Sequence, residues 1–170
     1  AQAKMSAPVI KKYGQKGKLI LVGTSYGGTL CALLAAQYPD IVDGLLLISS
    51  SIAPGEEAIW DIAKVIDSPI GEFFPKVLQV ATAEKLNHKR MLEEIEGEWN
   101  KVRCPTIMLH GSEDELIYPT NASFVFSHFK KAKKSISILG GLKHNIVVTK
   151  PTIVVSKIVE LLGNPMVACK

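Results

Sequence analysis

Short apolar runs at 19–22, 45–48, 106–109 and 135–139 alternate along this chain with segments whose apolar residues recur at helical spacing. The first three runs do not alternate with polar residues, which is typical of strands covered on both faces in a parallel sheet. Helices are predicted at 4–13, at 28–38, near 120–130 and from Pro151 onward. The pattern therefore predicts an α/β fold, a mostly parallel sheet with helices on both faces.

Residues 53–100 interrupt this alternation. They contain no strand-like apolar run, and helical patterns near 56–66, 69–80 and 82–99 are punctuated by prolines and a glycine. We therefore expect a core formed by residues 1–52 and 101–170, with a small helical insertion at 53–100.

The segment 23–27 reads Gly-Thr-Ser-Tyr-Gly and lies between a predicted strand and a predicted helix. This matches G-x-S-x-G, which places Ser25 on a sharp turn at the end of the strand. The backbone strain of such a turn costs on the order of 1–3 kcal/mol, and the following helix N-terminus favours negative charge nearby. The alternative is a glycine-rich turn with an incidental serine, such as one that holds a phosphate. No Walker lysine and no G-x-G-x-x-G spacing supports that alternative.

Two later loops complete a pattern. Residues 110–117, His-Gly-Ser-Glu-Asp-Glu-Leu-Ile, resemble the acid loop H-G-x-x-D-x-x-[VI] of the α/β-hydrolase superfamily, with Asp114 at the acid position. Residues 140–145, Gly-Gly-Leu-Lys-His-Asn, resemble its closing loop, with His144 as the histidine. By spacing alone, Glu113 and Glu115 rival Asp114.

The resemblance implies a catalytic triad of Ser25, Asp114 and His144, in the chain order of that superfamily. His144 would take the hydroxyl proton of Ser25, and Asp114 would fix the imidazole tautomer. Each residue follows a predicted parallel strand, so we expect the three at one edge of the sheet. The N–H of Tyr26 is the expected oxyanion donor.

The departure from the family lies at the front of the chain. The family's nucleophile usually follows the fifth of eight strands, whereas Ser25 follows the first strand that we find. The missing part would supply a second oxyanion donor. The strand from Leu19 to Val22 would then be an apolar edge prone to aggregation. We expect an upstream segment or a separate chain to cover it.

The resemblance also implies that the insertion is a lid over the site. Its large apolar residues would either line an acyl pocket or only pack the lid on the core, and core packing is favoured for any single one: Trp60, Ile70, Phe73, Phe74 and Trp99. Trp60, Phe73 and Phe74 are our candidates for substrate binding. Among the remaining histidines, His110 is expected to order the acid loop, and His88 and His128 are expected to be structural or exposed.

We therefore expect a serine hydrolase that cleaves a small ester, thioester or related acyl substrate through an acyl-enzyme on Ser25. No metal and no organic cofactor is implied. Two alternatives stay open. The first is a hydrolase-like protein that binds a small molecule as a sensor, and the second is an inactive fragment of a hydrolase.

Composition changes this picture little. The net charge of the 170 residues is +4, and the lysines gather at 11–18 and 130–134. We interpret them as solvated helix ends and loops rather than as a site for an anionic partner. Aromatic residues do not interleave with them in the way that single-strand binders need, so we expect no nucleic acid. No apolar run approaches the roughly 20 residues of a membrane span. Three widely spaced cysteines, Cys31, Cys104 and Cys169, argue against a disulfide framework or zinc site and favour the cytoplasm.

Overall fold

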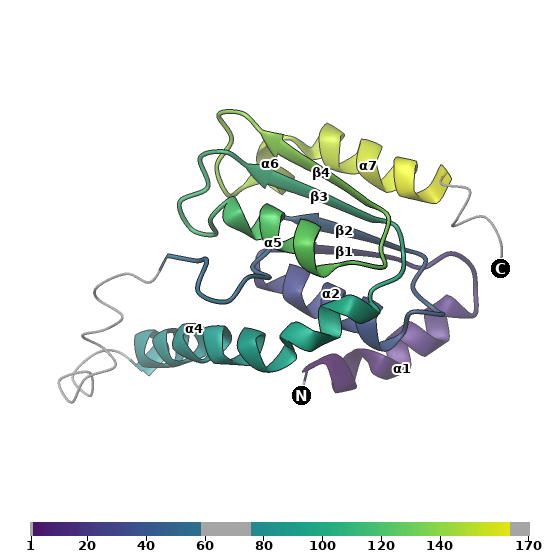
Figure 1. Cartoon of the computed structure of the whole chain (residues 1–170), viewed down its shortest axis with the longest axis horizontal. Coiled ribbons are helices and arrows are strands. Elements are labelled where there is room, and N and C mark those ends of the chain that lie inside the picture. The colour runs from purple at the N-terminus through teal and green to yellow at the C-terminus, as the bar shows by residue number, and fades with distance from the viewer. Residues whose placement is uncertain (1, 59–75, 164–170) are drawn as a thin grey trace.

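The computed structural model describes the backbone of residues 2–58 and 76–163, and the side chains of residues 5–58, 76 and 87–163. Four strands form one sheet in the order β1-β2-β3-β4, and every neighbouring pair is parallel. Their bounds are Ile20–Thr24 for β1, Gly44–Ile48 for β2, Thr106–Gly111 for β3 and Lys134–Leu139 for β4. The carboxyl ends of all four therefore lie at one edge of the sheet (Figure 1). The predicted parallel α/β architecture is confirmed.

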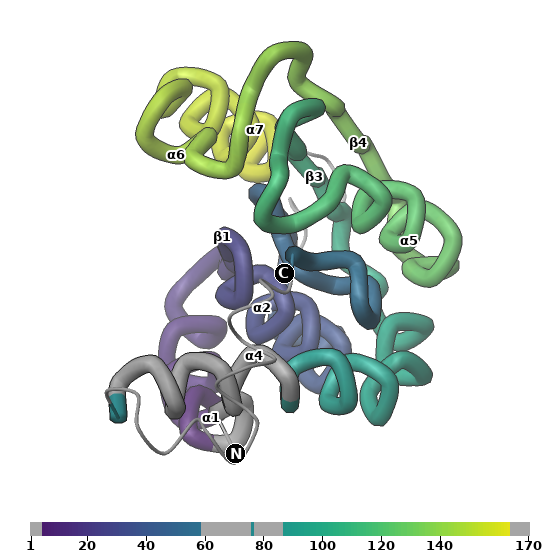
Figure 2. The backbone as a smooth tube through the Cα atoms, turned by 90° about the vertical axis from the view of Figure 1, so that its left-hand side faces the viewer, coloured from purple at the N-terminus to yellow at the C-terminus, as the bar shows by residue number. Residues whose placement is uncertain are grey.

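The helices pack on both faces of this sheet. They are α1 (Gln2–Gly14), α2 (Tyr26–Gln37), α4 (Lys76–Ile95), the 3-10 helix η2 (Glu96–Lys101), α5 (Thr120–His128), α6 (Ile146–Thr149) and α7 (Pro151–Gly163). Helices α2, α5 and η2 share one apolar core with the sheet, and α6 and α7 share another. Figure 2 shows α6 and α7 on one side of the strands and α2 and α4 on the other. No helix of the described part is long and apolar enough to cross a membrane.

Strand β2 has no exposed side chain because an apolar core covers each of its two faces. Leu45 and Leu47 point into the core under α2, and Leu46 and Ile48 point into the core under α6 and α7. All four are 0% exposed. Each such side chain contributes about 1.5–3 kcal/mol by burial. An unbroken apolar run is therefore the pattern that this position in the sheet requires.

Several boundaries differ from the predicted ones. Strand β1 continues to Thr24 and α2 begins at Tyr26, so the turn between them is a single residue. Helix α4 is continuous from 76 to 95, without the break predicted between 80 and 82, because no glycine or proline occurs within it. Residues 56–58 are not helical, since Glu57 forms an isolated antiparallel bridge with Ile117.

The short helix α6 was not predicted. It contains only four residues, Ile-Val-Val-Thr, and all four are β-branched. β-branched residues have low helix propensity. Its single turn is stabilised by tertiary burial of Ile146, which is 0% exposed.

Close packing at the start of α2 depends on Gly23 and Gly28 rather than on Gly27. A Cβ on Gly23 would lie 2.5 Å from the carbonyl oxygen of Gly27, and one on Gly28 would lie 1.9 Å from Oγ of Ser50. A Cβ on Gly27 would meet nothing within 4 Å. The close approach therefore requires the first glycine of the motif and Gly28, but not the last glycine of the motif.

Candidate active site

Ser25 is the one-residue turn between β1 and α2. Its φ of 52° and ψ of −128° lie outside the regions that non-glycine residues favour, as expected for a strained nucleophile turn. Three backbone hydrogen bonds hold this conformation. The Ser25 N–H donates to the carbonyl of Ile48 at 3.1 Å, and the Ser25 carbonyl accepts from the N–H groups of Gly28 at 3.0 Å and Ser51 at 3.2 Å. The turn is therefore held by both β2 and α2.

Helix α2 begins immediately after this serine. Backbone N–H groups in the first turn of a helix point out of its N-terminal end, where the helix dipole stabilises negative charge. Tyr26 is the first residue of α2, so its N–H lies in this turn beside Ser25. The role of this N–H as an oxyanion donor stays a prediction.

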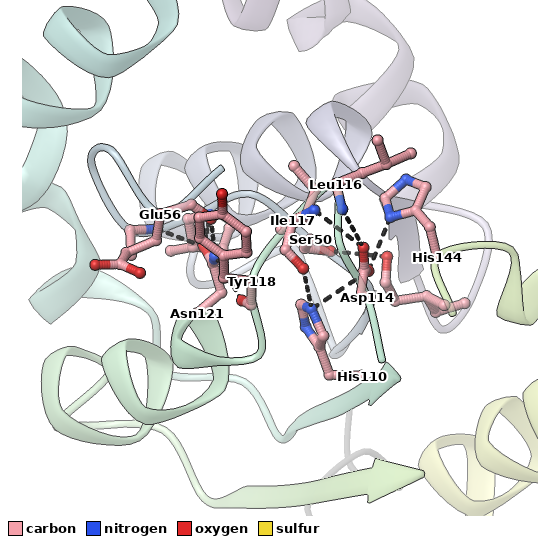
Figure 3. Close-up of polar contacts among 12 residues, drawn as sticks. Ser50, Glu56, His110, Asp114, Leu116, Ile117, Tyr118, Asn121 and His144 are labelled. Carbon is pink, nitrogen blue, oxygen red and sulfur yellow. Dashed lines mark hydrogen bonds and ion pairs between the residues drawn. The ribbon is translucent and has the colours of Figure 1, made fainter. Parts of the chain in front are cut away.

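Asp114 and His144 are brought together from the loops after β3 and β4. Oδ2 of Asp114 accepts from Nδ1 of His144 at 2.9 Å, and Oδ1 accepts from the N–H groups of Leu116 and Ile117, both at 3.0 Å (Figure 3). The carboxylate is fully buried, whereas 18% of the His144 side chain is exposed. A carboxylate that accepts from Nδ1–H leaves Nε2 of the imidazole as the basic nitrogen. His144 thus has the tautomer of a general base.

The acid loop is ordered by His110, as predicted. Its ring is 0% exposed, and Nε2 lies 2.9 Å from the carbonyl oxygen of Ile117 and 3.5 Å from Oδ2 of Asp114. Burial lowers the pKa of His110, and the contacts with Ile117 and Asp114 oppose that shift. His110 is therefore neutral near neutral pH, with the proton on the Nε2 that donates to Ile117. It fixes the loop without adding a cation that would compete for Asp114.

The rivals of Asp114 do not enter the site. Glu113 and Glu115 are exposed, and only Asp114 turns inward to His144. Ser25 shares the same sheet edge because β1, β3 and β4 run parallel. Among the described residues, no hydrogen bond joins Ser25 Oγ to His144, so this contact stays a prediction. Catalytic hydrogen bonds often tighten only when substrate binds.

The expected pocket residues divide into two groups. Trp60, Phe73 and Phe74, together with Ile70, lie outside the described residues. Trp99 is 0% exposed and stacks on Phe129 with ring centroids 5.8 Å apart, so it packs in the core rather than lining a pocket. The division of the chain into a core and a lid stays a prediction.

Asn121 is a site residue that the sequence did not reveal. Its amide is 0% exposed and makes four hydrogen bonds, accepting from the N–H groups of Ile52 and Ala53 and donating to the carbonyls of Glu56 and Tyr118. All the hydrogen-bonding capacity of the amide is thus satisfied. It ties the loop after β2 to the acid loop (Figure 3). A single Asn at a helix start gives no local sign of this role.

We predicted that His128 and His88 are structural or exposed. His128 is half-buried and stacks on Phe124, with Nε2 at 3.2 Å from Oε1 of Glu96. His88 is buried, with 5% of its surface exposed. Burial lowers the pKa of His88. The described residues contain no group of three or more potential metal ligands.

We expect the stability of the chain to fall in mild acid. His88 and His110 have lowered pKa values in the folded state, whereas unfolded histidine titrates near 6.5. Below about pH 6.5 the unfolded state therefore binds more protons, and unfolding becomes easier by at most about 1.4 kcal/mol per pH unit for each histidine. Urea unfolding between pH 5 and 8 measures this slope. His110→Asn should reduce it and His128→Gln should not; a slope unchanged by His110→Asn would contradict the assignment.

Residues 2–79 match the family model described as the alpha/beta hydrolase fold. The thermostable monoacylglycerol lipase of Bacillus sp. (strain H-257) is 28% identical over an alignment of 138 residues, which covers 74% of this chain and 54% of that protein. The chain thus spans about half the length of this curated relative.

Two solved structures with similar folds have lipolytic names. A structure from work on LipS and LipT, two metagenome-derived lipolytic enzymes, has a TM-score of 0.71 and 13% identity, with 95% of this chain and 72% of that chain covered. The monoacylglycerol lipase of Paleococcus ferrophilus has a TM-score of 0.66 and 21% identity, with 95% and 73% covered. At these identities the structural similarity shows the fold.

Proposed function

The chain belongs to the α/β-hydrolase superfamily, and on this premise we propose that it provides the nucleophile, base and acid of a serine hydrolase acting on an ester, thioester or related acyl compound. The observation that carries the proposal is the 2.9 Å hydrogen bond between His144 and Asp114 at the sheet edge where the strained Ser25 lies. The names of the similar proteins favour an ester among these substrates.

The proposed reaction has two halves. Ser25 Oγ attacks the acyl carbonyl while Nε2 of His144 takes its proton, and the N–H of Tyr26 donates to the developing oxyanion. The intermediate collapses, and His144 returns the proton to the leaving alcohol or thiol. Water, deprotonated by His144, then attacks the acyl-enzyme, and the acid is released with Ser25 regenerated. Asp114 stabilises the imidazolium in both halves.

A fluorophosphonate probe tests this proposal directly. We expect one probe molecule to add per chain, at Ser25, as measured by intact mass and peptide mapping. Ser25→Ala should abolish the adduct. Ser127→Ala, which removes an exposed hydroxyl that bonds within α5, should not. A folded chain without an adduct would contradict the proposal and favour the inactive fragment. An adduct without turnover of any acyl ester would favour the sensor.

We further propose that a strand from outside residues 1–170, within a longer chain or from a partner, pairs with the free edge of β1. Among the described residues, β1 pairs with β2 alone. Val22 of β1 is 43% exposed, and an exposed apolar edge strand promotes association. A chain of these 170 residues that stays a soluble monomer in sedimentation would contradict this proposal.

A further inference from the structure

Three buried polar side chains outside the triad form a hydrogen-bonded chain, the His88–Ser51–Glu57 chain. His88, on helix α4, is 5% exposed, and its Nε2 lies 3.0 Å from Oγ of Ser51. Ser51 follows β2 and is 1% exposed, and its hydroxyl donates to Oε2 of Glu57 at 3.3 Å. Burying three polar side chains is costly unless they are hydrogen-bonded, so these contacts fix all three.

The direction of the hydrogen bonds fixes the state of His88. The single proton of the Ser51 hydroxyl is donated to the carboxylate of Glu57, so Oγ accepts from His88. Nε2 of His88 therefore carries the proton, and Nδ1 is the bare nitrogen, which is buried without a hydrogen-bond partner. A chain in which each donor points toward a carboxylate is cooperatively strengthened.

The backbone of Ser51 holds the nucleophile turn. Its N–H donates to the carbonyl of Ser25 at 3.2 Å, and its own carbonyl accepts from the hydroxyl of Thr29 on helix α2. The ring of His88 lies against the ring of Tyr26, with centroids 5.0 Å apart. His88 thus contacts the residue after the nucleophile directly, and reaches the nucleophile itself through Ser51.

The Glu57 end of the His88–Ser51–Glu57 chain reaches the acid loop. Glu57 forms the isolated bridge with Ile117. On either side of it, the Ala58 N–H donates to the carbonyl of Leu116 at 2.8 Å and the Tyr118 N–H donates to the carbonyl of Glu56 at 3.1 Å. The N–H groups of 116 and 117 are those that hold Asp114. One chain of contacts therefore joins α4, the nucleophile turn and the acid loop.

We propose that His88 is a positioning residue which, through Ser51 and Glu57, holds the nucleophile turn and the acid loop in their relative places; its importance for the reaction rests on the proposed function. The segment that carries His88 is the one on which the resemblance places the lid. The proposal therefore links the insertion to the geometry of the reacting groups by a defined set of hydrogen bonds.

The test compares His88→Leu with His88→Gln in the full chain. Leucine fills the volume but donates nothing, whereas the glutamine amide can present an N–H near the position of Nε2. Hydrogen exchange is measured for the amides of Ser51, Ala58 and Tyr118, which hold the turn and the acid loop. We expect exchange about 2- to 10-fold faster in His88→Leu, the effect of losing one hydrogen bond, and close to wild type in His88→Gln. The exchange rate of the Thr106 amide, at the amino end of β3 and away from the site, should not change.

A second variant keeps the test independent of changes in packing around the ring. Ser51→Ala removes the hydroxyl and leaves the backbone hydrogen bonds, and it should reproduce the exchange pattern of His88→Leu. Amide exchange in the double variant should be no faster than in either single variant, because both substitutions interrupt the same His88–Ser51–Glu57 chain. Unchanged exchange in His88→Leu, or a uniform increase that includes Thr106, would overturn the proposal.

Fluorophosphonate labelling separates this proposal from the proposed function. We expect the limiting labelling rate of His88→Leu to fall about 10-fold or more, with little change in the half-saturating probe concentration, and His88→Gln to recover it. A wild-type chain that does not label would contradict the hydrolase function, while the exchange data would still decide the role of His88. A labelled wild type with an equally fast His88→Leu would overturn the positioning role alone.

Discussion

Replacing Asp114 with asparagine is expected to lower the rate of acyl transfer by about 10⁴ while leaving the fold intact. Asparagine fits the same space, and its Oδ1 can still accept from the N–H groups of Leu116 and Ile117. Its Nδ2, however, cannot accept from Nδ1 of His144, so the imidazole loses the contact that leaves Nε2 basic. Fluorophosphonate labelling rates and ester turnover measure the loss.

The acid loop supplies a control for this substitution. Glu115→Gln removes a neighbouring charge that is exposed, and it should change the rate less than about threefold, as most surface substitutions do. Circular dichroism should show both variants folded. Equal losses in Asp114→Asn and Glu115→Gln would mean that the net charge of the loop matters rather than the bond to His144.

Replacing Gly111 with alanine is expected to destabilise the chain by about 1–3 kcal/mol, the usual cost of overpacking. The new Cβ would lie 2.2 Å from the carbonyl oxygen of Leu142 and 2.7 Å from that of Lys143. These are backbone atoms, which cannot rotate away as the end of a side chain can. The closing loop must therefore move, and His144 moves with it. A displacement near 1 Å costs about 10²-fold in rate.

Gly140→Ala is the matched control in the same loop. A Cβ at Gly140 would meet nothing within 4 Å, and its φ lies outside the left-handed region. Urea midpoints measure stability and fluorophosphonate labelling measures the displacement of His144. If Gly111→Ala is as stable and as reactive as Gly140→Ala, the close approach of β3 to the closing loop does not matter for the site.

The strands and the three motifs are readable from local sequence because each signal lies within a few residues. The run at 45–48 is apolar throughout since β2 has a core on each face. Ser25, Asp114 and His144 each follow a strand, and parallel strands place their ends at one edge whatever the details of packing. The chain order of the motifs left Glu113 and Glu115 open beside Asp114, and the resemblance of residues 110–117 to the family's acid loop was needed to predict the bond between His144 and Asp114.

Helix boundaries were less predictable than the strands. Helix α4 runs through the predicted break at 80–82, since no residue there stops it. Helix α6 forms in spite of poor propensity because Ile146 is buried under it. The local sequence itself therefore permits α4, whereas in α6 the local preference is weak and tertiary contacts outweigh it.

The amino-acid sequence alone determined the class of fold, the mostly parallel direction of its strands and the residue types at the ends of three of them. It did not reveal the contacts that hold those residues in place. The partners of Ser51 at His88 and of Ile52 at Asn121 are 37 and 69 positions away, and nothing in the local pattern marks them. Only the folded chain decides such pairs, because a buried polar group is satisfied by whatever the packing brings beside it.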